Sequence, residues 1–260
     1  MFRKTGVRLV SRPQSLTSRP AVPTRSHQRE NSRSVPVAVF DLDGTLVDTA
    51  PDLWASLNHC LVEVGLPPTT LELVRPHAGH GAKVMLQHAY THAGHPLSEQ
   101  EADGQLARFL AYYEAHIADA SAPFPGVVEA MERLRSAGYR LAVCTNKTER
   151  LSRLLLDTLG LSDRFAAICG ADTFARRKPD PVHLLGTIER AGAAREEAIM
   201  IGDTATDTDA AVAARVPSIL VDFGYAPDER ARRTADAVIE TYDDLDADLC
   251  DRLIERHGRD

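Results

Sequence analysis

The sequence predicts an α/β protein: a Rossmann-like, mainly parallel sheet core with an α-helical cap inserted after the first strand. From residue 127 onward, short apolar segments alternate with helix-length segments, which is the pattern of consecutive βαβ units. One further apolar run, at 37–40, is separated from them by residues 50–122, which show helical patterns only. A chain of 260 residues with 43% hydrophobic residues is large enough for such a core and a smaller second domain.

Residues 1–35 are predicted to be a basic extension outside the fold. They contain eight Lys/Arg and one acid, Glu30, and they lack sustained apolar periodicity. Their richness in Arg and Ser also fits an organellar transit peptide. Prolines at 13, 20 and 23 interrupt any amphipathic helix, which favours a disordered extension or a start assigned too far upstream. We therefore expect a cytoplasmic protein, with an organellar location as the alternative.

The rest of the chain is acidic. Residues 36–260 hold 22 of the 30 Lys/Arg and 36 of the 37 Asp/Glu, so nucleic acid is not an expected partner. No apolar run reaches the ~18 residues of a membrane helix, so no membrane association is expected either. The cysteines are scattered without a C-x-x-C pair, which indicates reduced thiols: Cys60, Cys144, Cys169 and Cys250. The sequence leaves both a monomer and a homodimer open.

The core is expected to comprise residues 36–48 and 123–260, and its first part ends in two carboxylates. Asp41 and Asp43 follow the apolar run at i and i+2, so their side chains point to the same side of an extended chain. Gly44 lets the chain turn sharply behind them. Two carboxylates ~5 Å apart repel by roughly 3 kcal/mol at an effective dielectric of about 20. A positive charge between them, or a proton on one of them, is therefore expected.

The cap is expected to span residues 49–122 and to be entirely helical. Its first helix has leucines at i, i+4 and i+8 and ends at a glycine followed by two prolines. A Pro-Phe-Pro-Gly segment at 123–126 then breaks the chain. The expected cap helices lie at 51–64, at 71–93 with an interruption at 76–81, and at 99–118.

The second core segment alternates between helices and strands. The expected helices lie at 127–137, 148–159, 181–191 and 207–214. The expected strands lie at 139–145, 166–170, 198–201, 218–221 and 237–239. Ligands of such sheets bind outside the carboxyl ends of the strands, so the polar residues found there are the candidates for a functional site.

Four polar clusters occupy these strand ends and adjacent loops. They are Asp41 with Asp43, Thr145 with Asn146, the segment 177–181 with Lys178, and the segment 202–207 with Asp203 and Asp207. Together they offer several carboxylates, one lysine and neutral donors. Hard oxygen ligands favour Mg²⁺ over zinc or copper, and Mg²⁺ held by few carboxylates shares its shell with phosphate oxygens. The clusters therefore predict a Mg²⁺-dependent site for phosphoryl transfer from a small phosphorylated metabolite.

In this order, the clusters resemble the four motifs of the haloacid dehalogenase (HAD) superfamily. They read Asp-Leu-Asp-Gly-Thr-Leu-Val-Asp-Thr from residue 41, Thr-Asn-Lys from 145, Lys-Pro-Asp-Pro from 178 and Gly-Asp-Thr-Ala-Thr-Asp from 202. The resemblance implies that Asp41 is a nucleophile forming an aspartyl-phosphate, and that Asp43 is the general acid and then the base. The residues alone do not say which of these two attacks.

The resemblance also implies roles for the other residues of the motifs. Mg²⁺ would be held by Asp41, the backbone carbonyl of Asp43 and Asp203. The remaining implied roles are these: Thr145 binds the transferring phosphoryl group, Asn146 frames the phosphate site, Lys178 neutralises charge and keeps Asp41 ionised, Asp207 orients Lys178 or a metal-bound water, and Asp48 supports the turn into the cap.

The cap resembles that of phosphoglycolate phosphatases, as does Val221–Tyr225. Residues 74–83 resemble their glycine-flanked specificity loop, although His77 and His80 depart from the expected aromatic residue and asparagine. The implied reaction is hydrolysis of 2-phosphoglycolate to glycolate and phosphate. The expected specificity residues are Arg75, Gly79, His80, Gly81 and Lys83, with His80 and Lys83 meeting a substrate carboxylate.

Several alternatives remain at this level. A phosphosugar phosphatase, such as one acting on N-acetylmuramic acid 6-phosphate, would look much the same, and a sugar phosphomutase would also keep both aspartates. Dehalogenases and phosphonate hydrolases of the superfamily do not need the acid at Asp43. A catalytically silent HAD-fold binding protein would be favoured by loss of Asp41, Asp203 or Lys178, and all three are present.

Overall fold

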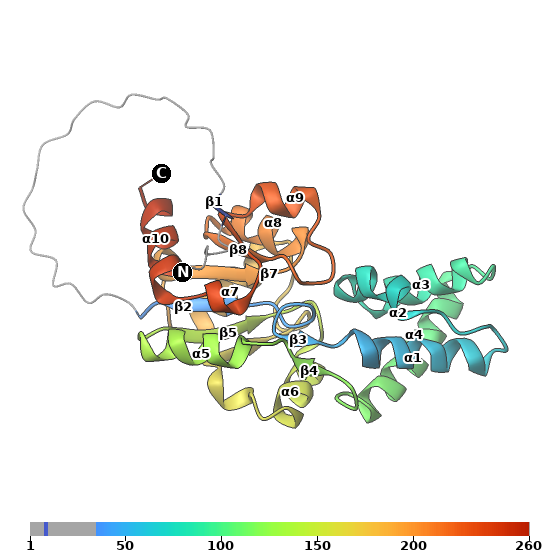
Figure 1. Ribbon diagram of the computed structural model, residues 1–260. Coiled ribbons are helices and arrows are strands. Elements are labelled where there is room, and N and C mark those ends of the chain that lie inside the picture. The colour runs from blue at the N-terminus through green and yellow to red at the C-terminus, as the bar shows by residue number, and fades with distance from the viewer. Residues whose placement is uncertain (1–7, 10–34, 260) are drawn as a thin grey trace, which may run out of the picture.

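The computed structural model describes residues 8–9 and 35–259, which are built around one seven-stranded sheet (Figure 1). The strand order is β1-β9-β8-β7-β2-β5-β6, and every neighbouring pair is parallel except β1 with β9. The predicted Rossmann-like α/β class with a mainly parallel sheet is confirmed. The strands are β1 (Arg8–Leu9), β2 (Val37–Phe40), β5 (Arg140–Cys144), β6 (Ala167–Cys169), β7 (Ala198–Gly202), β8 (Ser218–Val221) and β9 (Ala237–Ile239).

Strand β2 lies in the interior of the sheet, which explains why it is an unbroken apolar run. It pairs with β5 on one side and β7 on the other, so that Phe40 is opposite Val143 and Ile201. Successive side chains point to opposite faces of a strand. Ala38 therefore joins the apolar core on one face of the sheet and Val39 the core on the other. The residues that follow Phe40 are positioned by a strand buried on all sides.

Helices cover both faces of this sheet. Helices α7 and α8 pack on the face of Val39, through side chains such as Leu184 and Ala211. Helices α5, α6 and α10 pack on the opposite face, through side chains such as Leu134 and Leu249. The core helices are α5 (Val127–Ser136), α6 (Glu149–Thr158), α7 (Pro181–Arg190), α8 (Ala205–Ala214), α9 (Glu229–Thr234) and α10 (Ala247–His257).

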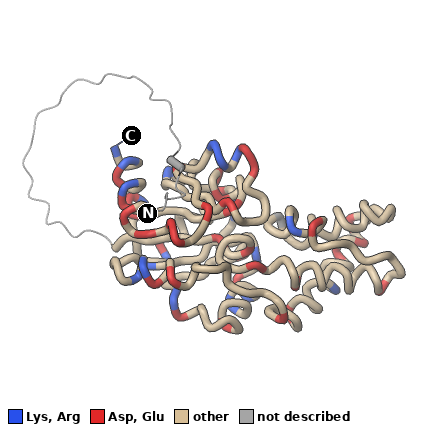
Figure 2. Tube along the Cα trace, in the orientation of Figure 1, with Lys and Arg blue, Asp and Glu red and all other residues tan. Residues whose placement is uncertain are grey.

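The helices between residues 50 and 115 form a separate layer at one end of the core, on the right in Figure 1. They pack through apolar side chains such as Leu57, Leu86 and Phe109. Only three Lys/Arg and seven Asp/Glu occur in this segment, whereas both signs alternate along α10 (Figure 2). We call this layer the cap. It consists of α1 (Ala50–Glu63), α2 (Leu71–Val74), the 3-10 helix η1 (Arg75–His80), α3 (Ala82–His92) and α4 (Glu99–Ala115).

Two short strands, β3 (Val47–Asp48) and β4 (Ala122–Pro123), join the cap to the core as an antiparallel pair. We call this pair the stem. The sequence predicted no strand between 50 and 122, which is wrong at residue 122, where β4 begins; the predicted break at 123–126 is a turn that follows β4. The stem has only two strands, so Pro123, which lacks an N–H, can lie at its edge without interrupting the hydrogen bonds of a larger sheet.

A buried carboxylate fixes the cap to the chain that leaves it. Asp52, in the first turn of α1, accepts hydrogen bonds from the backbone N–H groups of Ala120 and Ser121 at 2.7–3.1 Å. It also accepts the Ser121 hydroxyl at 2.5 Å. A carboxylate that is buried in this way is stable only when several donors satisfy it. Asp52 therefore holds the entry and exit of the cap together.

Most of the predicted extension at 1–35 lies outside the described residues. Within it, Arg8 and Leu9 pair with Val238 and Ala237 of β9, a strand that the sequence did not predict. The disordered and targeting interpretations of the extension stay predictions. None of the helices in the described ranges is both long and apolar enough to cross a membrane.

Candidate active site

The four polar clusters meet at the carboxyl edge of the sheet. Asp41 follows β2, Thr145 follows β5 and Asp203 follows β7, and these three strands are adjacent. Lys178 lies in the loop before α7, where its backbone N–H donates to Nδ1 of His183 at 3.1 Å. Because the strands are parallel, residues that are far apart in sequence come to lie around one point. The clusters thus form a single site.

Lys178 is a buried cation held by two carboxylates. Its Nζ lies 2.8 Å from Oδ1 of Asp41 and 2.6 Å from Oδ1 of Asp207. Burial lowers the pKa of this ammonium group, but Asp207 and Asp41 outweigh burial, and the pKa is raised. Burial raises the pKa of Asp41 to about 7, against the opposing charge of Lys178. Lys178 therefore remains charged and compensates part of the negative charge of the site.

Three buried carboxylates form a compact cluster beside this ion pair. Asp41, Asp203 and Asp207 each place one oxygen within 4.8 Å of the others. Asp203 is fixed by two donors: Oδ2 accepts the N–H of Tyr225 at 2.7 Å and Oδ1 accepts the hydroxyl of Thr45 at 3.1 Å. The orientation of Asp203 is thus fixed by hydrogen bonds, with its carboxylate close to those of Asp41 and Asp207.

The charge of this cluster fits a divalent cation. Burial raises the pKa of Asp203 well above its usual range, and Asp207 and Asp41 raise it further. Three carboxylates are balanced here by the single ammonium group of Lys178. A cation held by hard oxygen donors would remove the excess negative charge, and such donors suit Mg²⁺ better than a soft metal.

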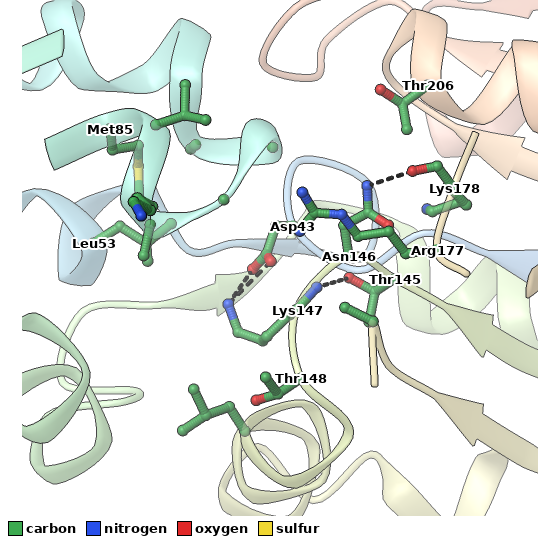
Figure 3. A pocket seen from close by; sticks show the side chains of 18 of the residues that line it. Asp43, Leu53, Met85, Thr145, Asn146, Lys147, Thr148, Arg177, Lys178 and Thr206 are labelled. Carbon is green, nitrogen blue, oxygen red and sulfur yellow. Dashed lines mark hydrogen bonds and ion pairs between the residues drawn. The ribbon is translucent and has the colours of Figure 1, made fainter. Parts of the chain in front are cut away.

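Asp43 is held by a different cation, Lys147, which had no predicted role. Nζ of Lys147 lies 2.8 and 3.0 Å from the two carboxylate oxygens, and the hydroxyl of Thr49 donates to Oδ1 at 2.6 Å. Figure 3 shows Lys147 extending from the loop after β5 toward Asp43. Burial lowers the pKa of Lys147, but Asp43 and Tyr113 together outweigh burial and the pKa is raised. The sequence feature that could have indicated this role is a lysine directly after the Thr-Asn pair at the end of β5.

Thr145 and Asn146 organise the loop after β5. The N–H of Thr145 donates to the carbonyl of Cys169 at 3.0 Å, and its Oγ1 accepts the N–H of Lys147 at 3.2 Å. Nδ2 of Asn146 donates to the carbonyl of Lys178 at 3.1 Å (Figure 3). Asn146 thus fixes the loop that carries Lys178. The predicted contacts of Thr145 and Asn146 with phosphate stay predictions.

Gly44 makes the close approach of the first motif to Asp203 possible. Its φ is 84°, in the left-handed region that favours glycine. A Cβ at this position would lie 2.4 Å from Oδ2 of Asp203 and 2.8 Å from the ring of Tyr225. Any side chain here would therefore displace a carboxylate of the cluster.

Asp48 connects the stem to the cap and to the core. Its Oδ2 lies 3.1 Å from Nη2 of Arg75, and its Oδ1 accepts the hydroxyl of Tyr225 at 2.8 Å. The same hydroxyl accepts the N–H of Ala50, the first residue of α1, at 2.8 Å. The supporting residue Asp48 and the predicted specificity residue Arg75 thus meet each other at the stem.

A cavity of about 260 Å³ lies between the cap and the core edge. Leu53 and Met85 lie on its cap side, and Thr145 and Lys178 lie on its core side (Figure 3). The apolar cap wall and the charged core wall enclose a space suited to a small polar ligand.

The predicted specificity residues Gly79, Gly81 and Lys83 also line this cavity. Lys83 was expected to meet a substrate carboxylate, but its Nζ is 2.8 Å from both Glu99 and Asp103 of the cap. Its charge is therefore already compensated by two acids. The side chain of His80 lies outside the described residues.

This fold and this arrangement of residues define the class of protein. The chain belongs to the haloacid dehalogenase-like hydrolase family, whose family model matches residues 38–221. The resemblance expected from the four motifs is therefore confirmed.

Individual relatives agree with this membership. The chain is 47% identical to the phosphoglycolate phosphatase of Mesorhizobium japonicum, over 86% of this chain and 99% of that protein. It is 46% identical to the phosphoglycolate phosphatase of Agrobacterium fabrum, over 85% of this chain and 95% of that protein. Among solved structures, a predicted phosphoglycolate phosphatase from Haemophilus somnus matches with a TM-score of 0.75 and 29% identity, over 83% of this chain and 98% of that one.

Proposed function

We propose that this chain is a Mg²⁺-dependent phosphatase that hydrolyses 2-phosphoglycolate to glycolate and phosphate. The observation that carries the chemistry is the buried ion-pair chain from Asp41 through Lys178 to Asp207, beside Asp203, at the end of the central strand. The substrate assignment is supported by relatives 45–47% identical to this chain that are named phosphoglycolate phosphatase.

In the proposed first step, a carboxylate oxygen of Asp41 attacks phosphorus. The bond between phosphorus and the ester oxygen breaks, its electron pair stays on that oxygen, and Asp43, which enters this step protonated, donates its proton to it. Glycolate leaves, and an aspartyl-phosphate remains on Asp41. Lys178 contributes by keeping Asp41 ionised in a buried site, where the pKa of this carboxyl is raised.

In the proposed second step, a water molecule attacks the same phosphorus atom. It gives a proton to Asp43, which the first step left ionised, and the bond to Asp41 breaks. Inorganic phosphate leaves, and both aspartates return to their initial protonation states. The ion pair with Lys147 and the hydrogen bond from Thr49 hold the Asp43 carboxylate in place between the two steps.

Asp41, Asp203 and the backbone carbonyl of Asp43 would hold Mg²⁺. When bound, the ion supplies positive charge to the phosphoryl oxygens and to the crowded carboxylates. The support for this assignment is the excess negative charge of three buried carboxylates and the hard character of their oxygen atoms. Thr45 and Tyr225 preserve the orientation of Asp203 through the two hydrogen bonds described above.

The proposal is tested by phosphate release from 2-phosphoglycolate with Mg²⁺, with EDTA, and with EDTA followed by excess Mg²⁺. We expect activity that EDTA removes and Mg²⁺ restores. Values of kcat/KM are then compared for 2-phosphoglycolate, ribose 5-phosphate and N-acetylmuramic acid 6-phosphate. A preference for either sugar phosphate would replace the substrate assignment and leave the phosphatase assignment intact. Absence of turnover on all three and on p-nitrophenyl phosphate would leave the binding-protein alternative.

A further inference from the structure

The ion pair of Lys147 with Asp43 suggests more than neutralisation of a carboxylate. Only 7% of the Lys147 side-chain surface is exposed, and the residue lines the cavity between cap and core. Its Nζ also lies 4.8 Å from the ring centroid of Tyr113, a buried residue of α4 in the cap. Lys147 is therefore a cation placed where the chemistry of the core meets the cap.

The cations that line this cavity differ in how fully their charge is compensated. Lys178 is bound by two carboxylates at 2.6 and 2.8 Å, and Lys83 is bound by two at 2.8 Å. Arg177 is exposed to solvent. Lys147 is shielded from solvent and has one carboxylate partner, Asp43. Among these four, Lys147 is the shielded cation with the most capacity for a second anion.

The position of Asp43 fixes where that second anion would lie. As the proposed general acid, Asp43 must lie within about 2.7 Å of the ester oxygen that leaves. Nζ of Lys147 is 2.8 Å from the same carboxylate, so it is within roughly 6 Å of that ester oxygen. A carboxylate one carbon away from the ester oxygen reaches about 3 Å toward Nζ, and an ion pair of about 2.8 Å closes the remaining gap.

We propose that Lys147 is a substrate-binding residue that selects short phosphomonoesters carrying a second anionic group one carbon from the ester oxygen. This inference rests on the phosphatase function proposed above and replaces the predicted role of Lys83 as the partner of the substrate carboxylate. Tyr113 packs over the ammonium group from the cap, so the bound anion is recognised where cap and core are in contact. A neutral leaving group gains nothing from this cation.

The experiment compares 2-phosphoglycolate with 2-hydroxyethyl phosphate, which has the same chain length and no carboxylate. The variants are Lys147→Met, which removes the charge, and Lys147→Arg, which keeps it. For Lys147→Met we expect kcat/KM to fall about 10- to 100-fold more on 2-phosphoglycolate than on 2-hydroxyethyl phosphate, which is the range for a lost hydrogen bond to a charged group. Lys147→Arg is expected to recover part of this selectivity. Arg177→Met, which removes an exposed cation from the same cavity, is expected to change both values equally.

The inhibition constant of glycolate provides a second readout, because it reports carboxylate binding without catalysis. We expect it to rise in Lys147→Met in parallel with the loss of selectivity. Equal losses on both substrates would overturn the inference, because they would show that Lys147 acts only through Asp43 or through the fold. A selectivity change in Lys83→Met instead of Lys147→Met would also overturn it. If the wild type hydrolyses neither substrate, the proposed function itself fails, which is a distinguishable outcome.

Discussion

The core edge and the cap line the same cavity with opposite chemistry. The core contributes buried charged side chains, with Lys178 between Asp41 and Asp207 and Lys147 on Asp43. The cap contributes mainly apolar side chains, such as Met85. Fixed charges near the reacting atoms are effective because the surrounding protein cannot reorganise away from them. We therefore expect the reaction to take place at the core, with the cap excluding water and shaping the space for the leaving group.

Two lysines allow this comparison to be made with matched chemistry. Lys178 in the core and Lys83 in the cap are each bound by two carboxylates at nearly equal distances. The Lys178 side chain is 1% exposed and that of Lys83 is 35% exposed. The two ion pairs should therefore contribute differently to stability, since solvent screens an exposed pair and screens a buried one much less.

The largest expected effect is on activity and lies in the core. Asp41→Asn should lower kcat by about 10⁴-fold or more, because the proposed nucleophile is lost. The melting temperature should not fall, because burial and neighbouring acids already disfavour the charged carboxylate, whose pKa is raised to about 7. The measurements are phosphate release and thermal unfolding. Retention of more than about one per cent of the wild-type kcat would contradict the assignment of Asp41 as nucleophile.

The next effect is on stability and uses the two matched lysines. Lys178→Met should lower the free energy of unfolding by about 3–5 kcal/mol, because two buried carboxylates lose their partner. Lys83→Met should lower it far less, because its partners remain solvated. Both are measured by urea denaturation without metal. Similar losses in the free energy of unfolding for the two variants would contradict the expected difference between buried core pairs and exposed cap pairs.

A third effect concerns His183, which lies in the core and accepts the backbone N–H of Lys178. Burial, together with the charge of Lys178, lowers the pKa of its imidazole from 6.5 to about 4. The unfolded chain therefore binds a proton at a pH where the folded chain does not. The stabilisation of the folded state by neutral His183 is fully present above pH 6.5. It is lost as the pH falls toward 4, which lowers the free energy of unfolding by about 2–3 kcal/mol in total. His183→Gln should flatten this part of the stability curve in urea titrations at pH 4–7, and an unchanged slope would contradict it.

The smallest expected effect concerns the stem of the cap. Asp52→Asn should lower the free energy of unfolding by about 1.5–3 kcal/mol, because charge-assisted hydrogen bonds to Ala120 and Ser121 are weakened. Because the cap then closes less firmly over the cavity, KM should rise more than kcat falls. Steady-state kinetics with Ser121→Ala as the milder control measures this. A loss confined to kcat would place Asp52 in the reaction rather than in the positioning of the cap.

The sequence predicted the core part of the site better than the cap part for a physical reason. Asp41, Thr145 and Asp203 each follow a buried strand directly, so the parallel sheet places them together once strand order is known. The partners of Lys83 depend instead on how α3 lies against α4. The partners of Asp52 depend on the path of the chain where it leaves the cap. Such contacts follow from tertiary packing, which no local pattern contains.

Lys147 combines a position that the sequence predicted with a contact that it could not predict. Its position after β5 followed from the same motif as Thr145, yet its partner Asp43 belongs to a neighbouring strand end. The ion pair between Lys147 and Asp43 could not be predicted without knowing in which direction the Lys147 side chain points. The two-residue strand at Arg8–Leu9 was missed for a related reason, because a segment this short becomes a strand only through the edge it pairs with.

The pairing of β3 with β4 has a consequence for how this fold can diversify. Asp48 and Ala122 are direct partners in the ribbon, so the polypeptide enters and leaves the cap at one point. For the core, the whole cap is thus equivalent to the loop of a hairpin, and the entropy of closing a loop depends only weakly on its length. A lid of another size, or a plain two-residue turn, could be grafted between these positions without changing the register of the central strand. The cap could therefore be exchanged by engineering at a single junction, while Asp41 and Lys147 would stay in the core.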